Sequence, residues 1–527
     1  MSADSQSASP TQEEWRPSSN PWFIAVAVML ATFVEVLDTT IVSVAVPNIA
    51  GALAATPDEA TRVLTCYLIA NAIILPASGW LSLRFGRKRL ILVCTTLFAV
   101  ASFLCGFAPS MSFLLVCSAL QGVAGGAMVP LSQTILMESF PPAKRGMAMA
   151  MFALGLVVAP AIGPVIGGWL TDNYSWRWVF FINVPICLLA FAMMWRFVED
   201  PPYVRNAKAG RIDTMGFILI GIWLASFQFA MDDGQKKDWF GSAYIARLAW
   251  ISTIAFVLML IRELRTKSPI VDLRVFLNRN FLVGSILILL FSVAMYGGVT
   301  GVPLFLQTLM GYTSQLAGNA TAPRGIAAAL AMPIIGCLLS RIDGRWITVF
   351  GLLIFAIATF QLGNINLAVS MNSIIWPCAL QGIGMSCVFV SLMTISMGTL
   401  PNEKMANASG LFNLVRNLGG SVGIALTNTF VARGLQSHYS RFIPHVTIYD
   451  PIYQQQSQML QQSLTPVAGA SQAAHQAQGV IQGILLQQAS VMAYVDIFRW
   501  TTIMLVVVVP LAFLLKKVVA REGAATH

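Results

Sequence analysis

The chain has 527 residues, of which 57% are hydrophobic and 10% are charged, and its formal net charge is +10. Because a soluble domain carries about 25% charged residues, this composition excludes a soluble globular protein and predicts an all-α polytopic membrane protein. The positive charge is then no indication of nucleic acid binding and has to be assigned loop by loop. The sequence lacks phosphate-binding Gly-Lys-Ser/Thr loops, HExxH motifs and zinc-spaced Cys/His clusters, so we expect no catalytic residues, no metal and no enzyme activity.

Residues 1–21 are polar and rich in Ser, Pro and Gln. They lack the basic start and the small-residue cleavage site of a signal peptide, so we expect a disordered cytoplasmic tail in front of an uncleaved first span. Fourteen apolar stretches follow, each expected to cross the bilayer as a helix. They lie near residues 22–46, 60–82, 89–107, 112–137, 145–170, 177–197, 214–231, 243–262, 281–309, 315–340, 346–363, 372–399, 405–432 and 494–515.

The loops between these spans alternate in positive charge. Loops after even-numbered spans are basic, and the first of them holds four basic residues between Arg84 and Arg89. Loops after odd-numbered spans mostly lack Lys and Arg, although Lys236 and Lys237 are an exception. Since basic loops stay in the cytoplasm, we expect both termini on the cytoplasmic side.

The first span contains two carboxylates, Glu35 and Asp38, which are three residues apart and therefore share one helix face. An ionised carboxylate near the membrane centre costs roughly 2.5–3.5 kcal/mol on insertion scales, so a chain that keeps two of them must gain something from them. The functional interpretation is that both face an internal cavity and take up and release protons. The structural alternative is that they lie near a helix end or pair with a basic residue.

An internal repeat relates the two parts of the chain. Leu120-Gln121-Gly122 in the fourth span recurs as Leu380-Gln381-Gly382 in the twelfth, at an offset of 260 residues. Further matches at this offset are Thr134 and Thr394, Met137 and Met397, Pro141 and Pro401, and Lys144 and Lys404. The repeat predicts an N-terminal six-helix half (22–198), two inserted helices with linkers (199–280), a C-terminal six-helix half (281–518) and a cytoplasmic tail (519–527). Paired halves around a central cavity are typical of transporters.

Polar side chains within the spans are candidates for the substrate cavity. They are Asn71, Gln121, Gln133, Gln307 and Gln381. For each of them, hydrogen bonding between helices is the alternative role. The 24 methionines suit an adaptable apolar pocket, although most must pack or face lipid.

A tight basic turn connects the second and third spans. Its glycines let two helix ends approach, and its basic side chains can bind helix carbonyls or nearby acids. The residues concerned are Gly79, Arg84, Gly86, Arg87 and Lys88. The turn resembles the GxLaDRxGRKxxL loop of the major facilitator superfamily, which gates the inward-facing cavity, but Leu83 replaces the usual Asp. Arg84 and Arg87 must therefore find other partners, unless the turn serves only as an orientation signal.

The fifth span carries a stripe of small residues at intervals of four, with two prolines between them. These residues are Gly155, Ala159, Pro160, Gly163, Pro164, Gly167 and Gly168. Small residues let helices pack closely in lipid, and prolines loosen the backbone hydrogen bonding. The stripe resembles the gxxxGPxxGG antiporter motif of proton-coupled drug exporters. Close packing without a further role is the alternative.

Three more stretches, Leu37–Val42, Trp176–Pro185 and Met231–Phe240, extend the resemblance over the chain. Together the motifs resemble a fourteen-span drug:proton antiporter of the EmrB/QacA type, on the EmrB side. This implies proton-coupled efflux of hydrophobic or amphipathic drugs by alternating access across the bacterial inner membrane, and hence antibiotic resistance. It also implies the proton motive force in place of a cofactor, and a tripartite pump with a periplasmic membrane-fusion adaptor and an outer-membrane channel.

One departure from this family concerns an arginine in the fourth span. The family's fourth span usually reads RxxQG, with an arginine linked to proton transfer, whereas Ser118 stands at that arginine position here. Either the first-span acids suffice for coupling, or Arg324 or Arg416 within later spans compensates. A narrow-range exporter of a metabolite, fatty acid or siderophore, and a non-transporting scaffold or sensor, are the alternative functions.

The segment 434–493 is expected to be a long outer loop. It is rich in Gln, and Val467–Ala489 has the pattern of an amphipathic helix. Loops of this length in a compact fold are usually functional, which favours a docking surface for an extracytoplasmic partner. A solvated linker is the alternative.

Overall fold

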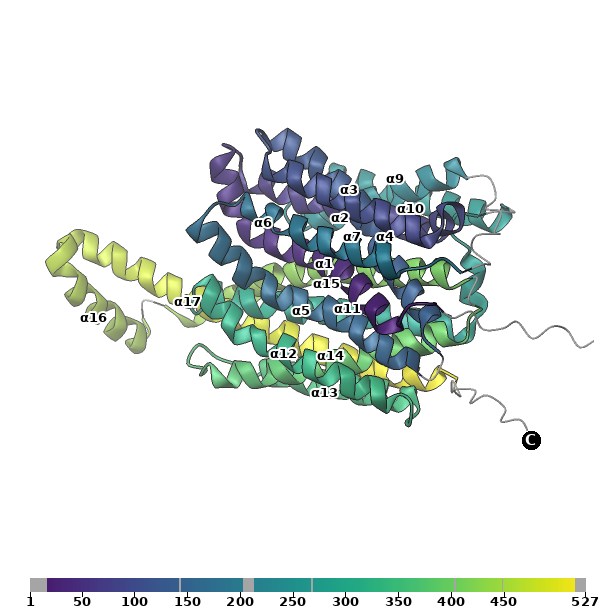
Figure 1. Ribbon diagram of the computed structural model, residues 1–527. Coiled ribbons are helices and arrows are strands. Elements are labelled where there is room, and N and C mark those ends of the chain that lie inside the picture. Colours follow the sequence, from purple (N-terminus) through teal and green to yellow (C-terminus); the bar gives the residue numbers. More distant parts are fainter. Residues whose placement is uncertain are drawn as a thin grey trace, which may run out of the picture.

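The computed structural model describes residues 17–141, 144–201, 213–266, 269–401, 404–447 and 449–516. Helices account for the regular structure of these residues, and most of them run side by side along one long axis (Figure 1). In the described ranges, 13 helices are long and apolar enough to cross a membrane. The all-α polytopic prediction is confirmed, whereas the count of fourteen spans and the cytoplasmic termini stay predictions.

The first six predicted spans form one group of helices. They are α1 (Pro21–Ala52), α2 (Pro57–Phe85), α3 (Arg87–Gly106), α4 (Met111–Ser139), α5 (Arg145–Asn173) and the pair α6 (Trp178–Phe181) and α7 (Asn183–Phe197). Side chains cap several helix starts: Asn20 accepts the Trp22 amide, and Thr56 and Glu59 form a capping box at α2. The sixth span thus has a break at Ile182 that the sequence pattern did not predict.

The inserted helices contact both halves of the protein. The insert comprises α9 (Thr214–Asp233), η2 (Trp239–Gly241), α10 (Ala243–Arg265) and η3 (Leu273–Leu277). Thr65 of α2 donates to Asp232 of α9 at 2.9 Å. One turn earlier on the same face of α9, Ser421 of α15 donates to Gln228 at 2.8 Å. The insert therefore lies against α2 and α15, two of the helices that meet between the halves.

The second half repeats the packing of the first. It contains α11 (Arg279–Thr308), α12 (Ser314–Leu338), α13 (Gly344–Leu362), α14 (Asn372–Gly398), α15 (Met405–Phe442), η5 (Ile443–His445), α16 (Pro451–Ala468), α17 (Ala470–Val508) and η6 (Val509–Leu514). A Cβ at Gly122 would collide with the Tyr67 carbonyl, and one at Gly382 would collide with the Arg324 carbonyl. Helix α12 therefore packs on α14 as α2 packs on α4, and Arg324 takes the place of Tyr67.

Two repeat-related residues meet where the halves join. Gln133 of α4 and Met393 of α14 are 260 residues apart, the offset of the sequence repeat, and the Gln133 Nε2 lies 3.9 Å from the Met393 Sδ. Residues that touch their own repeat mates lie near an axis that relates the two halves. Gln133 therefore marks the centre of the interface between the halves.

Most described residues of the segment 434–493 are helical, which extends the helix predicted for Val467–Ala489. Helix α15 continues to Phe442, α16 follows, and α17 runs from Ala470 into the last span without interruption. The α16–α17 hairpin projects beyond one end of the bundle (Figure 1). Its Gln and Ala residues favour helix, Asp450 caps α16, and Gly469 turns the chain with a φ of 77°.

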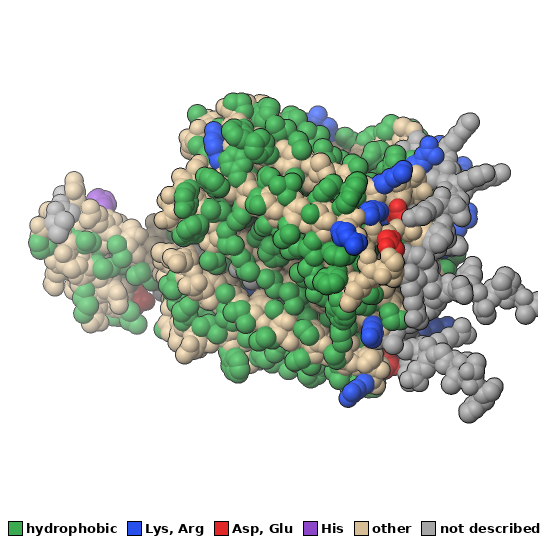
Figure 2. Space-filling view, in the orientation of Figure 1, with side chains coloured by type: hydrophobic (Ala, Val, Ile, Leu, Met, Phe, Trp, Pro, Cys, Tyr) green, Lys and Arg blue, Asp and Glu red, His purple; other side chains and the backbone are tan. Residues whose placement is uncertain are grey.

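Basic side chains mark the opposite end of the bundle. The visible Lys and Arg residues gather mainly near the end where α1 begins, away from the projecting hairpin (Figure 2). We call this the basic end. It includes the α2–α3 turn at Gly86 and the starts of α5 and α15.

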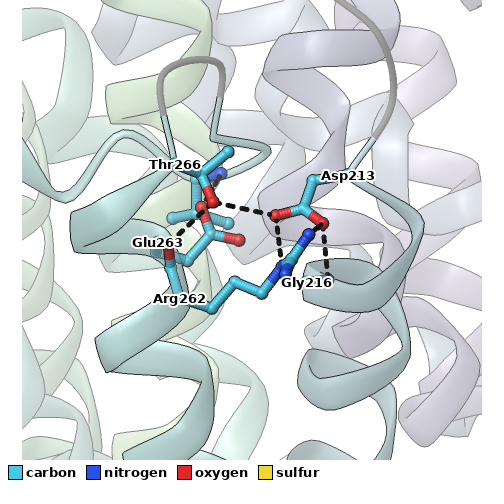
Figure 3. Close-up of polar contacts among 6 residues, drawn as sticks. Asp213, Gly216, Arg262, Glu263 and Thr266 are labelled. Carbon is cyan, nitrogen blue, oxygen red and sulfur yellow. Dashed lines mark hydrogen bonds and ion pairs between the residues drawn. The ribbon is translucent and has the colours of Figure 1, made fainter.

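Close polar contacts join the start of α9 to the end of α10 (Figure 3). Arg262 donates from Nη2 and Nε to Asp213 Oδ1 at 2.8 and 2.9 Å, and Thr266 donates to Asp213 Oδ2 at 3.3 Å. Burial acts to raise the pKa of Asp213, but the hydrogen bonds from Arg262 and the Gly216 amide outweigh it and hold that pKa below its ordinary value. Nearby, Glu263 accepts the Val271 amide at 3.2 Å.

These contacts position the strap, by which we mean residues 269–278 between α10 and α11. The Asp272 amide donates to Asn407 Oδ1 at 3.2 Å, and Asn407 Nδ2 donates back to the Asp272 carbonyl at 3.0 Å. Lys404 forms a loose ion pair with the Asp272 carboxylate at 3.9 Å. The strap thus fastens the insert to the start of α15.

Candidate functional site

Both acids of α1 are buried inside the protein. Glu35 is 8% exposed and Asp38 is 3% exposed, and both lie in the middle of a helix of 32 residues. They therefore face neighbouring helices, neither the helix ends nor the surface of the bundle. A membrane-buried carboxylate needs polar partners, and each acid has its own set.

Asp38 accepts hydrogen bonds from neutral side chains of two other helices of its half. Gln121 of α4 donates to Asp38 Oδ1 at 2.8 Å, and Asn183 of α7 donates to the same oxygen at 2.6 Å. Both amides also donate to Ser102 of α3, at 3.3 and 3.1 Å. The hydroxyl of Ser102 in turn donates to the Phe180 carbonyl at 2.8 Å. Asp38 is therefore a fixed acceptor within a network of uncharged donors.

Glu35 lies on the side of α1 that faces α2 and α15. Asn71 of α2 donates to Glu35 Oε1 at 2.9 Å, and Tyr67 donates to the Glu35 carbonyl at 3.4 Å. A Cβ at Gly125 of α4 would lie 2.9 Å from the Tyr67 hydroxyl and 3.1 Å from Glu35 Cγ, so this cluster needs glycine there. Arg416 of α15 is close enough for its positive charge to act on Glu35.

The predicted charge partners form no ion pair with the acids in this structure. Arg416 is buried, its Nη2 donates to Asn417 at 3.4 Å, and its Nε has no hydrogen-bond partner among the described residues. Arg324 lies in the other half, between α12 and α14, where its Nη2 donates to Cys378 Sγ at 3.7 Å. The acids are therefore not locked by a permanent ionic contact in this conformation.

The small-residue stripe of α5 packs against the helix that carries the acids. A Cβ at Gly163 would collide with Thr40 Oγ1, and one at Gly167 would lie 2.9 Å from Ile41 Cγ1. One at Gly155 would lie 3.0 Å from Met29 Cγ. Gly168, by contrast, has open space around it, while Pro160 and Pro164 lie within the helix. The stripe thus sets the distance between α5 and α1 on both sides of Glu35 and Asp38.

The α2–α3 turn finds acidic partners that the sequence motif did not reveal. Arg87 is buried and forms an ion pair with Glu138 at the end of α4. The Lys88 amide donates to Asp200 at 2.8 Å, and a Cβ at Gly86, where φ is 83°, would lie 2.9 Å from the same carboxylate. Glu138 and Asp200 therefore supply the negative charge that Leu83 does not, while Arg84 is exposed.

The two halves are in close contact near the basic end. A Cβ at Gly79 would lie 2.8 Å from Asn407 Cα, which brings α2 against α15, and one at Gly336 would lie 2.9 Å from Ala150 Cβ, which brings α12 against α5. Asn413 of α15 donates to Gln133 Oε1 at 2.8 Å, and Ser409 donates to the same oxygen. Gln133 thus fastens the halves together and is not a wall of an open cavity here.

The other predicted cavity residues lie apart from the acids. Gln381 is fully buried, donates to Thr359 at 3.4 Å, and leaves its Oε1 without a hydrogen-bond partner in the described part of the chain. Gln307 is exposed near the end of α11. The structure therefore brings Asn71 and Gln121 to the acids and leaves Gln307 and Gln381 in the second half.

Comparison with known proteins places the chain in a family. The sequence model of the major facilitator superfamily matches residues 28–424. Multidrug export protein EmrB of Haemophilus influenzae is 40% identical over 435 residues, which cover 82% of this chain and 84% of that protein. Fatty acid resistance protein FarB of Neisseria gonorrhoeae is 36% identical over 496 residues, 94% of this chain and 96% of that protein. The resemblance to the EmrB type is thereby confirmed.

A solved structure supports the same fold. The proton:xylose symporter XylE superimposes with a TM-score of 0.57 at 15% identity, over 92% of this chain and 94% of that one. At this identity the likeness concerns the fold alone. With its buried α1 acids and its bundle of apolar helices, the chain belongs to the major facilitator superfamily and is a multi-pass protein of the bacterial inner membrane.

Proposed function

We propose that the protein exports hydrophobic or amphipathic compounds, drugs among them, in exchange for protons. The observation that carries this proposal is the burial of Asp38 and Glu35 on α1, each held by neutral amides. A carboxyl group held by uncharged donors can gain and lose a proton, whereas one fixed by a permanent ion pair stays ionised. The likeness to proteins named multidrug export protein EmrB supports drugs as substrates.

The proposed cycle uses the contact between the halves as a gate. We take the basic end to be cytoplasmic, because basic loops stay in the cytoplasm. The contacts at Gly79 and Gln133 then close the protein toward the cytoplasm. In the outward-facing state the acids take up protons and substrate leaves, and in the inward-facing state they release the protons and substrate enters.

The energy available suits concentrative export. Moving one charge through 100 mV yields about 2.3 kcal/mol, and a gradient of one pH unit adds about 1.4 kcal/mol per proton. One proton therefore supports a substrate gradient on the order of a hundredfold or more. No cofactor enters this cycle.

We further propose that the α16–α17 hairpin docks a periplasmic membrane-fusion adaptor, which connects the protein to an outer-membrane channel. The hairpin projects beyond the bundle and exposes apolar side chains, among them Ile452 at 70% and Met459 at 57% (Figure 1). Its base is fixed, because Gln487 donates to the Leu309 carbonyl at 2.8 Å. Ile452→Asp and Met459→Asp should abolish co-purification of the adaptor and leave transport in liposomes intact. Unchanged co-purification would exclude the hairpin as the docking surface.

Transport by purified protein tests the main proposal. Proteoliposomes loaded with the cationic dye ethidium should lose dye faster when a pH gradient is imposed, and collapse of the gradient by a protonophore should abolish the difference. Protein-free liposomes serve as the control. Dye loss no faster than from protein-free liposomes would instead support a scaffold or sensor. Faster dye loss that does not depend on the gradient would contradict proton coupling.

A narrow-range exporter of fatty acids is the second candidate. The relative named fatty acid resistance protein FarB matches nearly the whole chain and supports this possibility. Ethidium efflux that fails while fatty acid efflux proceeds in the same proteoliposomes would favour it.

A further inference from the structure

Glu263, near the end of α10, is a buried acid outside α1 that the proposed cycle does not use. It is 3% exposed. Its Oε2 accepts the Val271 amide at 3.2 Å, whereas its Oε1 has no hydrogen-bond partner among the described residues. It takes part in none of the ion pairs between those residues. A buried carboxylate with one neutral donor is costly when it is ionised, because no counter-charge offsets the loss of water.

The neighbouring cation already serves another acid. Arg262 donates to Asp213 Oδ1 from Nη2 at 2.8 Å and from Nε at 2.9 Å. Asp213 also accepts the Gly216 amide at 3.1 Å and the Thr266 hydroxyl at 3.3 Å. Figure 3 shows these donors converging on Asp213, with Glu263 beside them. One guanidinium compensates one carboxylate, so the charge of an ionised Glu263 would be left without compensation.

The two acids approach each other at Gly216 of α9. A Cβ at this glycine would lie 2.7 Å from Glu263 Oε1 and 3.0 Å from Asp213 Oδ2, so the two oxygens flank one point on the helix. The charged groups that act on Glu263 are Asp213 at the start of α9 and Arg262 on its own helix. Two ionised acids this close repel each other, and a single proton shared by the pair relieves the repulsion.

The strap connects this pair of acids to the contact between the halves. Val271, whose amide the buried acid accepts, belongs to the strap. The next residue, Asp272, exchanges two backbone-to-side-chain hydrogen bonds with Asn407 at 3.2 and 3.0 Å, and its carboxylate faces Lys404. A Cβ at Gly79 of α2 would lie 2.8 Å from Asn407 Cα. The strap is therefore fastened to the residue at which α2 and α15 meet near the basic end.

We propose that Glu263 is a second proton-binding site of the transporter, and that its proton keeps the strap in place on α15. This inference rests on the proposed export function, for which it names a titratable group outside α1. With its proton, Glu263 is neutral, remains in the pocket beside Asp213 and accepts the Val271 amide.

Release of this proton to water at the basic end reverses the arrangement. It places a second negative charge beside Asp213, which draws the Glu263 carboxylate toward water and away from the Val271 amide. The stabilising contribution of the neutral acid is thus present at low pH and is lost as the pH rises. Because we take the basic end to be cytoplasmic, an alkaline cytoplasm loosens the strap and favours separation of the halves there.

Amide hydrogen exchange of the strap, followed by mass spectrometry on the full-length protein in nanodiscs, tests the proposal. The measurement covers roughly pH 6 to 9, a range in which buried glutamates titrate, and is corrected for the intrinsic pH dependence of exchange. Exchange in the wild type should accelerate with pH, by up to about tenfold per unit, because each opening releases one proton.

Three variants separate the role of the proton from that of packing. Glu263→Gln is neutral at every pH and keeps an acceptor for the Val271 amide, so the acceleration should disappear. Asp213→Asn removes the like charge and frees Arg262 to compensate an ionised Glu263, so the strap should again stop responding to pH. Asp172→Asn, at an exposed acid near the other end of α5, is the matched control and should behave as the wild type.

Failure of the site can be told apart from a folding defect and from failure of the export function. Slow exchange in the buried part of α14 shows that a variant is folded. A folded Glu263→Gln or Asp213→Asn protein whose strap accelerates with pH as in the wild type would overturn the proposal, and either variant decides the question alone. Wild-type exchange that does not respond to pH would overturn it as well. A wild-type strap that responds to pH in a protein that exports no ethidium would contradict the export function and leave the proton site standing.

Discussion

The two halves share one packing arrangement and differ in the charges placed on it. Gln121 and Gln381 are repeat mates, yet the first binds Asp38 and the second faces Gly298, the residue 260 positions after Asp38. Tyr67 and Arg324 are likewise equivalent, and only the second is charged. The acids therefore lie in the first half and an unpaired cation lies in the second. The comparison indicates that a repeated scaffold was specialised by a few substitutions at equivalent, buried positions.

We expect the largest effect on transport from removing Asp38, whose equivalent position in the second half is Gly298. Asp38→Asn keeps the size of the side chain and its contacts with the amides of Gln121 and Asn183, but removes the group that can carry a proton. We expect gradient-driven ethidium efflux to fall to the level of protein-free liposomes. Asp233→Asn, which removes a carboxylate from an i,i+4 pair with Lys237, should retain wild-type efflux. Equal efflux from both variants would contradict the assignment of proton coupling to Asp38.

Helix packing around the acids should be the next most sensitive feature. Gly163→Ala forces a Cβ against Thr40 on α1, so we expect a loss of roughly 1–3 kcal/mol of stability, seen as a lower unfolding temperature in detergent. Gly168→Ala on the same helix places its Cβ in open space and should change stability by less than about 0.5 kcal/mol. Similar shifts for the two variants would show that the stripe does not set the α1–α5 distance.

The paired glutamines sharpen the comparison between the halves. Gln121→Leu removes a hydrogen bond to a carboxylate, which is worth roughly 1.5–3 kcal/mol, so we expect about a tenfold or greater loss of transport rate. Gln381→Leu removes only a long contact to Thr359 and should leave the rate within about twofold of wild type. Initial rates in proteoliposomes measure both. A greater effect at Gln381 would place the more important polar contact in the second half.

The smallest effect is expected at the junction of α9 and α10. Since the pKa of Asp213 is lowered in the folded protein, its stabilising contribution is present above the ordinary pKa of an aspartate, about 3.9, and is lost as the pH falls through the folded pKa. The unfolding temperature of Asp213→Asn should thus be below that of wild type at neutral pH and approach it in acid. A difference that does not depend on pH would assign the contribution of Asp213 to packing.

Much of the membrane architecture could be predicted from sequence, because apolar length and basic loops are local properties. The acids stood out for the same reason, since Glu35 and Asp38 are rare charges within an apolar span. The partners of Asp38 could not be predicted. Asn183 is 145 residues away and uncharged, so only the packing of α7 against α1 brings it close. Within segment 434–493 a helix was predicted only for Val467–Ala489, and helix α16 and the extension of α15 were missed, although the Gln and Ala content favours helix.

The α2–α3 turn shows a different limit of sequence reasoning. Leu83 breaks the family motif, which suggested a missing charge, but the charge is present on Glu138 and Asp200 in other helices. An acid at the end of the fourth span and another just after the sixth were visible in the sequence. Nothing local indicated that either would reach the α2–α3 turn.

The most direct measurement is proton release by the purified protein in detergent, in weakly buffered solution with a pH indicator, when ethidium is added. We expect the wild-type protein to release protons and the double variant Asp38→Asn, Glu35→Gln to release none while it still binds the dye. Equal proton release by the double variant would contradict the assignment of coupling to the acids of α1.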